Sequence, residues 1–175
     1  STGFECVEAR VDGEEIEIDM GTARFQPAAV PTTFSGPALK KTVSAAGVSL
    51  DITAVGVGNP HCVHFCASLD DLPFDWRVVG AALESHHGFP NRVNVQFAQI
   101  IGPRSARLLI WERGAGETMA SGSSSCAVAA AAVKLGLLPA NRSLTMLMEG
   151  GRLTVTVSES YSLLLAGPVE IVGRI

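Results

Sequence analysis

The amino-acid sequence predicts an α+β fold in which a largely antiparallel or mixed β-sheet curls around one central buried helix. Short segments rich in β-branched residues, bounded by glycine, proline or asparagine, recur along most of the chain and indicate strands. The alanine-rich segment 123–135 has strong helix propensity and is apolar on nearly every side, so it must be enclosed. Predicted strands lie on both sides of this segment in the sequence, which favours a sheet folded around it.

The chain before the alanine-rich segment predicts antiparallel strands and one amphipathic helix. The strands are expected at residues 5–11, 14–19, 41–44, 49–57, 62–67, 92–101 and 106–111. Turns are predicted at Asp12–Gly13, at Ala46–Gly47 and between Gly102 and Ser105. The helix is predicted over residues 70–84, because the apolar residues there share one face and acidic residues suit an N-terminus.

The remainder of the chain completes the predicted sheet. Gly136 is expected to end the buried helix, with Pro139 close behind it. Three further strands are predicted at residues 143–148, 152–158 and 161–171. At 175 residues the chain is long enough for one domain with a substantial core, and too short for two independent ones.

Composition and charge exclude several classes of protein. The apolar fraction is 47% and only 17% of residues are charged, so general disorder is excluded. The net charge is -4 and the basic residues are scattered, which argues against a nucleic-acid partner. The longest apolar stretch, Cys126–Val133, is far too short to cross a bilayer, and Ser1–Cys6 does not resemble a signal segment. We therefore expect no membrane partner and a cytoplasmic location.

Four stretches combine glycine or proline with polar side chains that a simple core would not select. They are Gly58–His61, Phe89–Val95, Glu112–Thr118 and Ala120–Cys126. The last one leads into the buried helix, where small residues leave backbone N–H groups unpaired and within reach of an anion. Gly122 would let a carboxylate or phosphate approach closely, although a serine run that only caps the helix explains the same residues.

Charged and amide side chains in the other stretches are suited to an amino-acid ligand. Arg113 can bind a carboxylate in bidentate fashion, and Glu112 can receive an ammonium group. A surface ion pair at a strand end is the simpler alternative. Asn59 and Asn94 either contact a polar ligand or cap turns, and His61 is either catalytic or a hydrogen-bonded histidine at a strand end.

The cysteine pattern offers a weak metal hypothesis. Cys62, His64 and Cys66 would share one face of a strand beside His61. Successive positions on one strand face lie roughly 7 Å apart, and no fourth ligand is evident. We therefore expect reduced, buried strand cysteines and no metal.

In combination, the four stretches resemble the diaminopimelate epimerase family. Gly-Asn-Pro-His, Phe-Pro-x-Arg-x-Asn-Val and Glu-Arg-Gly-x-Gly-Glu-Thr occur in the family's order, followed by the small-residue helix start and Glu149–Gly151. The resemblance covers the family's C-terminal half, from Met20–Gly21 to Gly167–Pro168. It implies one lobe of a two-lobe, pseudo-symmetric isomerase that epimerises or racemises an amino acid, LL- to meso-diaminopimelate in lysine biosynthesis.

The resemblance also implies a chemistry without pyridoxal phosphate, metal or any other cofactor. In the family, a cysteine on each face of the α-carbon takes part: one thiolate removes the proton and the opposite thiol returns it. Ser121 stands at the position of one of these cysteines. The residues predicted as catalytic are Ser121, His61 and Glu112.

The substrate implied by the resemblance is a small amino acid. Gly122 and Ser123 would offer backbone N–H groups to its reacting α-carboxylate. Its distal amino-acid end would meet Asn59, Asn94, Glu112 and Arg113.

The family's other cysteine lies in an N-terminal lobe that has no counterpart here. We therefore expect a single domain over residues 1–175, with 1–20 as crossover strands from the missing lobe, 21–168 as the lobe core and 169–175 as a return strand. The chain would then be a fragment, produced by proteolysis or by design, and inactive alone. Its apolar face toward the missing lobe would also permit association as a homodimer.

The serine at position 121 leaves the chemistry open. An alcohol stays protonated at neutral pH, whereas a thiol has a reference pKa of about 8.5 that a helix N-terminus lowers. The serine is either natural or an engineered replacement. Two alternatives to an epimerase therefore remain: a one-base lyase or dehydratase of the same superfamily, and an amino-acid-binding module without catalysis.

Overall fold

The computed structural model describes residues 9–12 and 15–168, which form one mixed β-sheet and two helices. The helices are α1 (Trp76–Glu84) and α2 (Gly122–Lys134). The strands are β1 (Ala9–Asp12), β2 (Glu15–Thr22), β3 (Lys41–Ala45), β4 (Val48–Val57), β5 (Asn59–Phe65), β6 (Asn94–Gly102), β7 (Ser105–Glu112), β8 (Gly116–Thr118), β9 (Ser143–Met148), β10 (Gly151–Val157) and β11 (Ser162–Pro168). This composition agrees with the predicted α+β class.

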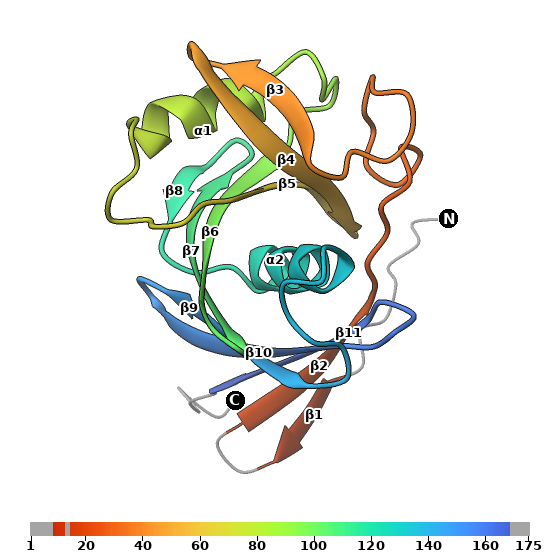
Figure 1. Ribbon diagram of the computed structural model, residues 1–175. Helices are drawn as coiled ribbons and strands as arrows, with labels where there is room; N and C mark the ends of the chain where they lie inside the picture. Colours follow the sequence, from red (N-terminus) through yellow and green to blue (C-terminus); the bar gives the residue numbers. More distant parts are fainter. Residues whose placement is uncertain (1–8, 13–14, 169–175) are drawn as a thin grey trace, which may run out of the picture.

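The strands form a single sheet that is antiparallel except at two places. From one edge to the other the order is β1, β2, β11, β10, β9, β7, β6, β5, β4 and β3, with β8 paired to β7 (Figure 1). The two parallel pairs are β5 with β6 and β7 with β9. Helix α1 lies in the chain between β5 and β6, and α2 lies between β8 and β9, so each parallel pair is joined through a helical connection.

Most predicted strands form near their predicted bounds. The N-terminal hairpin is confirmed where the structure describes it, since Ala9 pairs with Ile18 and Arg10 with Glu17. The predicted turn at Ala46–Gly47 is confirmed as well, with positive φ angles of 49° and 77°. The predicted strand segments 5–8, 14 and 169–171 lie outside the described residues. Strand β8 was not predicted, because three residues are too few to show a period.

Helix α1 is shorter than predicted at its N-terminus. It begins at Trp76 rather than Asp70, because the carboxylate of Asp75 caps it by accepting a hydrogen bond from the Arg77 N–H at 2.9 Å. Asp70 serves another purpose: it binds Arg107 of β7 through two contacts of 2.7 and 2.8 Å. The acidic residues at 70–71 therefore belong to the connection and not to the helix.

The sheet separates two hydrophobic clusters. Helix α2 packs on one face and contacts strands β4, β5, β6, β7, β9, β10 and β11. Helix α1 packs on the other face, against β3, β6 and β7. Alternating residues of a strand enter the two clusters, as period two requires: Ala98 of β6 faces α2, whereas Phe97 faces α1.

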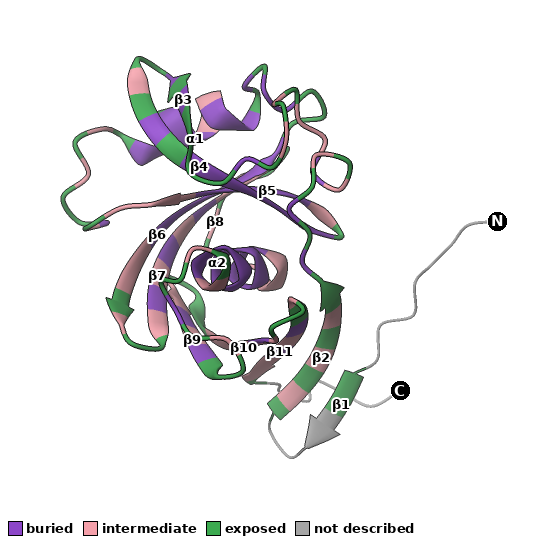
Figure 2. Cartoon of the chain, turned by 45° about the vertical axis from the view of Figure 1, so that its right-hand side comes forward, coloured by how far each residue is buried: buried purple, intermediate pink, exposed green. Residues whose placement is uncertain are grey.

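Helix α2 is deeply buried. Its residues 124–132 are all buried, and Figure 2 shows it almost entirely in the buried colour, in contrast to the mixed colours of β2. Gly136, at φ 70°, ends the helix as predicted, and its N–H donates to the Val133 carbonyl at 3.0 Å. In the described ranges, neither helix combines the length and the hydropathy needed to cross a membrane.

Candidate active site

The N-terminus of α2 presents two backbone N–H groups without partners among residues 9–12 and 15–168. Ser121 is the N-cap: its Oγ accepts from the Ser124 N–H at 3.4 Å, and its carbonyl accepts from the Ser125 N–H at 3.1 Å. The N–H groups of Gly122 and Ser123 have no acceptor in that part of the chain. Both residues are half-buried, so an anion can reach these donors at the positive end of the helix.

The segment before Ser121 is held by a close approach of two backbones. The Gly150 N–H donates to the Met119 carbonyl at 2.8 Å, and a Cβ at Gly150 would lie 3.0 Å from that oxygen. At Gly122 a Cβ would lie 2.9 Å from the end of the flexible Leu165 side chain, which can move aside. Backbone packing therefore accounts for Gly150, and the Glu149–Gly151 turn fixes the path of the chain into the helix.

The predicted residues on β5, β6 and β7 point to the same side of the sheet as α2. On β5, Asn59 and His61 alternate in step with Val63, which packs in the α2 cluster. On β6, Asn94 keeps the same parity as Ala98, which also packs there. Glu112, at the end of β7, is likewise in step with residues 106, 108 and 110 of that cluster.

A chain of hydrogen bonds links the first turn of α2 to Asn59. Gln96 of β6 donates from Nε2 to Ser124 Oγ at 3.0 Å, and the same Nε2 lies 3.1 Å from His61 Nδ1. His61 Nε2 in turn lies 2.7 Å from Asn59 Oδ1. Gln96, His61 and Ser124 are fully buried, so the chain is shielded from water.

The imidazole of His61 is held neutral. Burial lowers its pKa to about 3; the hydrogen bond with Gln96 opposes this effect, and the nearby charge of Arg113 adds to it. Both nitrogens of this neutral ring form hydrogen bonds, so the ring can hold the side chains of Asn59 and Gln96 in position. The predicted catalytic role of His61 stays a prediction.

Asn94 connects β5 and β6 to the turn after β7. Its Oδ1 accepts from the Arg113 N–H at 2.9 Å, and its Nδ2 donates to the Pro60 carbonyl at 3.0 Å. The Arg113 guanidinium donates to the Asn91 carbonyl at 3.0 Å and is exposed. Asn94 thus brings the segment around Pro60 and the segment around Arg113 together on the α2 side.

A buried carboxylate supports the same turn from the opposite face of the sheet. Glu84, at the end of α1, accepts from Trp111 Nε1 at 2.7 Å and from the Gly114 N–H at 2.8 Å, and it forms an ion pair with Arg92. Burial raises the pKa of Glu84, but the donors Trp111, Gly114 and Arg92 together outweigh burial and lower it. Glu84 therefore anchors the turn that carries Arg113.

A family model for diaminopimelate epimerase matches residues 53–172, a range that includes every predicted site residue. The chain belongs to the diaminopimelate epimerase family. Curated diaminopimelate epimerases are similar to it over most of its length: that of Pelotomaculum thermopropionicum is 38% identical over 158 residues, which are 89% of this chain and 54% of the relative. That of Desulforudis audaxviator is 39% identical over 163 residues, 93% of this chain and 55% of the relative. The chain thus spans about half the length of the epimerases it matches.

Solved structures of related folds are similar to the chain at low sequence identity. A hydroxyproline epimerase from Agrobacterium vitis, with bound trans-4-hydroxy-L-proline, matches 95% of this chain and 55% of its own, with a TM-score of 0.66 and 11% identity. A probable proline racemase from Agrobacterium radiobacter matches 91% of this chain and 53% of its own, with a TM-score of 0.64 and 10% identity. These likenesses show that the chain shares its fold with these two proteins.

Three residues that support the site were not among the predicted site residues: Gln96, Ser124 and Glu84. Gln96 could have been found, because it stands two residues after Asn94 on the same strand and so shares its face. Ser124 lies in the first turn of α2, where a buried serine gives no local sign of its partner on β6. Glu84 carried a weaker signal, a carboxylate one residue after Leu83 at the end of an apolar helix face.

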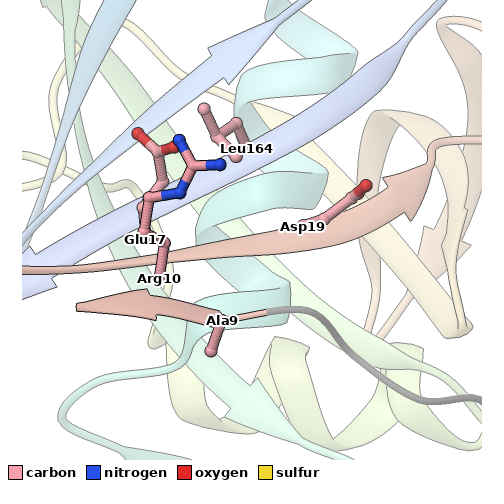
Figure 3. Close-up of a pocket in the computed structure, with 5 residues that line it drawn as sticks. All are labelled: Ala9, Arg10, Glu17, Asp19 and Leu164. Atoms are coloured by element: carbon pink, nitrogen blue, oxygen red, sulfur yellow. The ribbon is translucent and has the colours of Figure 1, made fainter.

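The strand residues considered as metal ligands and an open pocket at the edge of the sheet are not part of the candidate site. His64 binds the Asp51 carbonyl through Nδ1 at 2.9 Å, and within the described residues no three His, Cys, Asp or Glu side chains gather as a metal site. An open hollow lies over β1, β2 and β11, as Figure 3 shows, and its lining shares no residue with the predicted site. It is lined by Ala9, Arg10, Glu17, Asp19 and Leu164.

Proposed function

We propose that this chain supplies one face of the active site of a cofactor-independent amino-acid epimerase, acting on LL- and meso-diaminopimelate. The proposal rests on the Gly122 and Ser123 N–H groups, which have no acceptor among the residues that the structure describes, and on the buried hydrogen-bond chain beside them that leads to Asn59. A serine run that merely capped its helix would need neither feature. The family membership supports the same reading.

In this proposal the reacting α-carboxylate lies at the N-terminus of α2. Its oxygens accept from the Gly122 and Ser123 N–H groups, and the helix dipole favours the negative charge. As the α-proton leaves, charge grows on this carboxylate, so the same donors stabilise the transition state more than the ground state. The side chain at position 121 faces the carbon that reacts.

The distal end of the substrate lies toward the ends of β5, β6 and β7. Asn59 and the Arg113 guanidinium bind its carboxylate, and Glu112 receives its ammonium group. Asn94 contributes indirectly, because its Oδ1 accepts from the Arg113 N–H and so holds the turn that carries Arg113. Two charged ends bound at once would select a diamino-dicarboxylic acid over a shorter amino acid.

Ser121 limits what this face can do. An alcohol is not a base at neutral pH, but it can donate a proton. Full epimerisation therefore requires a thiol at position 121 or another base on this face. The serine favours a second candidate, a one-base lyase, in which a base outside this chain removes the α-proton and Ser121 donates a proton to the β-hydroxyl group that leaves as water. Loss of water from 3-hydroxyproline is the assay, and absence of that reaction would discard this candidate.

We further propose that the chain is one lobe of a two-lobe protein. The sheet wrapped around α2 would form the lobe core over residues 21–168, and the second lobe would supply the opposite face of the site. The span of about half of each curated relative supports this division. Binding of the same amino acid without turnover would instead indicate a module that has lost catalysis.

The test is deuterium incorporation at the α-carbon of diaminopimelate in heavy water. The intact two-lobe protein is compared with its Ser121→Cys and Ser121→Ala variants. We expect exchange in the cysteine variant to exceed that of the alanine variant by about 100-fold or more, the usual contribution of a positioned acid or base. An equal, absent exchange in the serine and cysteine proteins would contradict the proposed function.

A further inference from the structure

The buried amide of Gln96 lies beside two polar atoms, and the number of amide hydrogens left unpaired decides between its two orientations. Its amide group lies 3.0 Å from Ser124 Oγ and 3.1 Å from His61 Nδ1, while its Oε1 is buried without a partner among the described residues. An amide NH2 has two hydrogens, and here two atoms are placed to accept them. The reversed orientation would bury both hydrogens unpaired, which costs more than leaving one carbonyl oxygen unpaired.

This orientation determines the tautomer of His61. If Nδ1 accepts from Gln96, the hydrogen of the neutral ring is on Nε2. Nε2 then donates to Asn59 Oδ1, 2.7 Å away. Asn59 in consequence uses its oxygen internally, and its NH2 group stays available to donate to another molecule.

We propose that Gln96 is a positioning residue that holds His61 in the Nε2–H tautomer and so leaves the Asn59 NH2 group as the donor for a substrate carboxylate. The role of Asn59 in this statement rests on the proposed function, whereas the tautomer of His61 does not. Gln96 does not touch the substrate. It acts through His61, and through Ser124 it ties the same chain of bonds to the first turn of α2.

The environment of His61 supports the assignment. The ring is fully buried and is flanked by Asn59 and Gln96 on its two nitrogens. Burial also keeps the ring neutral, so a single hydrogen is shared between two positions and the neighbours decide which one it occupies.

The first experiment is nitrogen NMR of the intact protein labelled with 15N-histidine. The chain has four histidines, and the His61 signals are assigned by their loss in His61→Gln. We expect Nε2 to carry the hydrogen and Nδ1 to be unprotonated between pH 6 and 8, that is, about three or more pH units above its pKa. A hydrogen on Nδ1 in the unmodified protein would overturn the proposal. This measurement requires no variant at Gln96.

The second experiment compares Gln96→Leu with Gln99→Leu, a matched change on the same strand whose side chain faces the other side of the sheet. Removing the Gln96 donor should move the Nδ1 resonance toward that of a ring nitrogen without a hydrogen bond, and the Gln99 variant should leave it in place. An unmoved Nδ1 resonance in Gln96→Leu would overturn the role of Gln96.

The functional consequence is read by calorimetry with diaminopimelate. We expect Gln96→Leu to bind it about tenfold more weakly, the effect of one hydrogen bond to a charged group, and Gln99→Leu to bind it as the unmodified protein does. Equal affinities in all three proteins would overturn the link to Asn59. If no protein binds diaminopimelate, the proposed function fails, while the NMR result still decides the tautomer.

Discussion

Strands β5, β6 and β7 lie between two buried polar centres of opposite character. On the α1 face, the Glu84 carboxylate collects donors from Trp111, Gly114 and Arg92. On the α2 face, Gln96 and His61 form a chain without formal charge. A buried carboxylate that accepts several hydrogen bonds resists rearrangement strongly. In a neutral chain, the donor and acceptor roles of one group fix those of the next. We infer that the Glu84 centre maintains the backbone shape of the candidate site. The Gln96–His61 chain determines which side-chain groups of the site donate hydrogen bonds and which accept them.

The largest expected effect comes from removing the charged centre. Glu84→Ala leaves the Gly114 N–H and the Trp111 indole without their acceptor and should lower the free energy of unfolding by about 3 to 5 kcal/mol. Urea denaturation measures this. The control is Glu117→Ala, which breaks the exposed ion pair with Arg77 and should cost less than about 1 kcal/mol. Similar losses in both variants would remove the distinction between a buried anchor and a surface pair.

The neutral centre should matter less for stability. Gln96→Leu leaves Ser124 Oγ and His61 Nδ1 without the shared donor and should cost about 1 to 3 kcal/mol. Gln99→Leu, which loses one half-buried bond to the Leu69 N–H, should cost about 1 kcal/mol or less. If Gln96→Leu destabilised the fold as much as Glu84→Ala, the neutral chain would be structural in the same sense as the carboxylate.

The charge of Glu84 should also be visible in the dependence of stability on pH. Its pKa is lowered in the folded chain, so its contribution is complete above the unfolded value and is lost as the pH falls through the folded value. The stability difference between the unmodified protein and Glu84→Gln should therefore be constant near neutrality and shrink below a pH of about 4.3. A constant difference down to acid unfolding would show that the carboxylate gains nothing from its charge.

The contrast between the two centres also explains how far the sequence predicts this molecule. Alternating β-branched residues and the alanine-rich segment give the strands and α2 directly, because period and propensity are local properties. The start of α1 was predicted six residues early, since Asp70 and Asp75 look alike until Asp75 is seen to cap the helix and Asp70 to bind Arg107. The residues next to an exposed acidic residue in the sequence do not show which group it will bind.

The buried polar contacts needed the folded chain. Gln96 reaches Ser124, 28 residues away, and Glu84 reaches Gly114, 30 residues away. Such pairs join segments that only the strand order brings together, so a sequence shows the polar residues without showing which of them meet. The motifs predict a site, which stays a prediction, and the structure adds the polar residues that contact its predicted members.

The proposed function depends on binding of a substrate carboxylate by the Gly122 and Ser123 N–H groups. Backbone amide NMR of the intact protein, titrated with diaminopimelate, tests it most directly. We expect these two amide signals to shift together, along one saturable binding curve, and to shift more than the amides at the other end of α2. Saturable binding that moves signals elsewhere and leaves these two in place would contradict it.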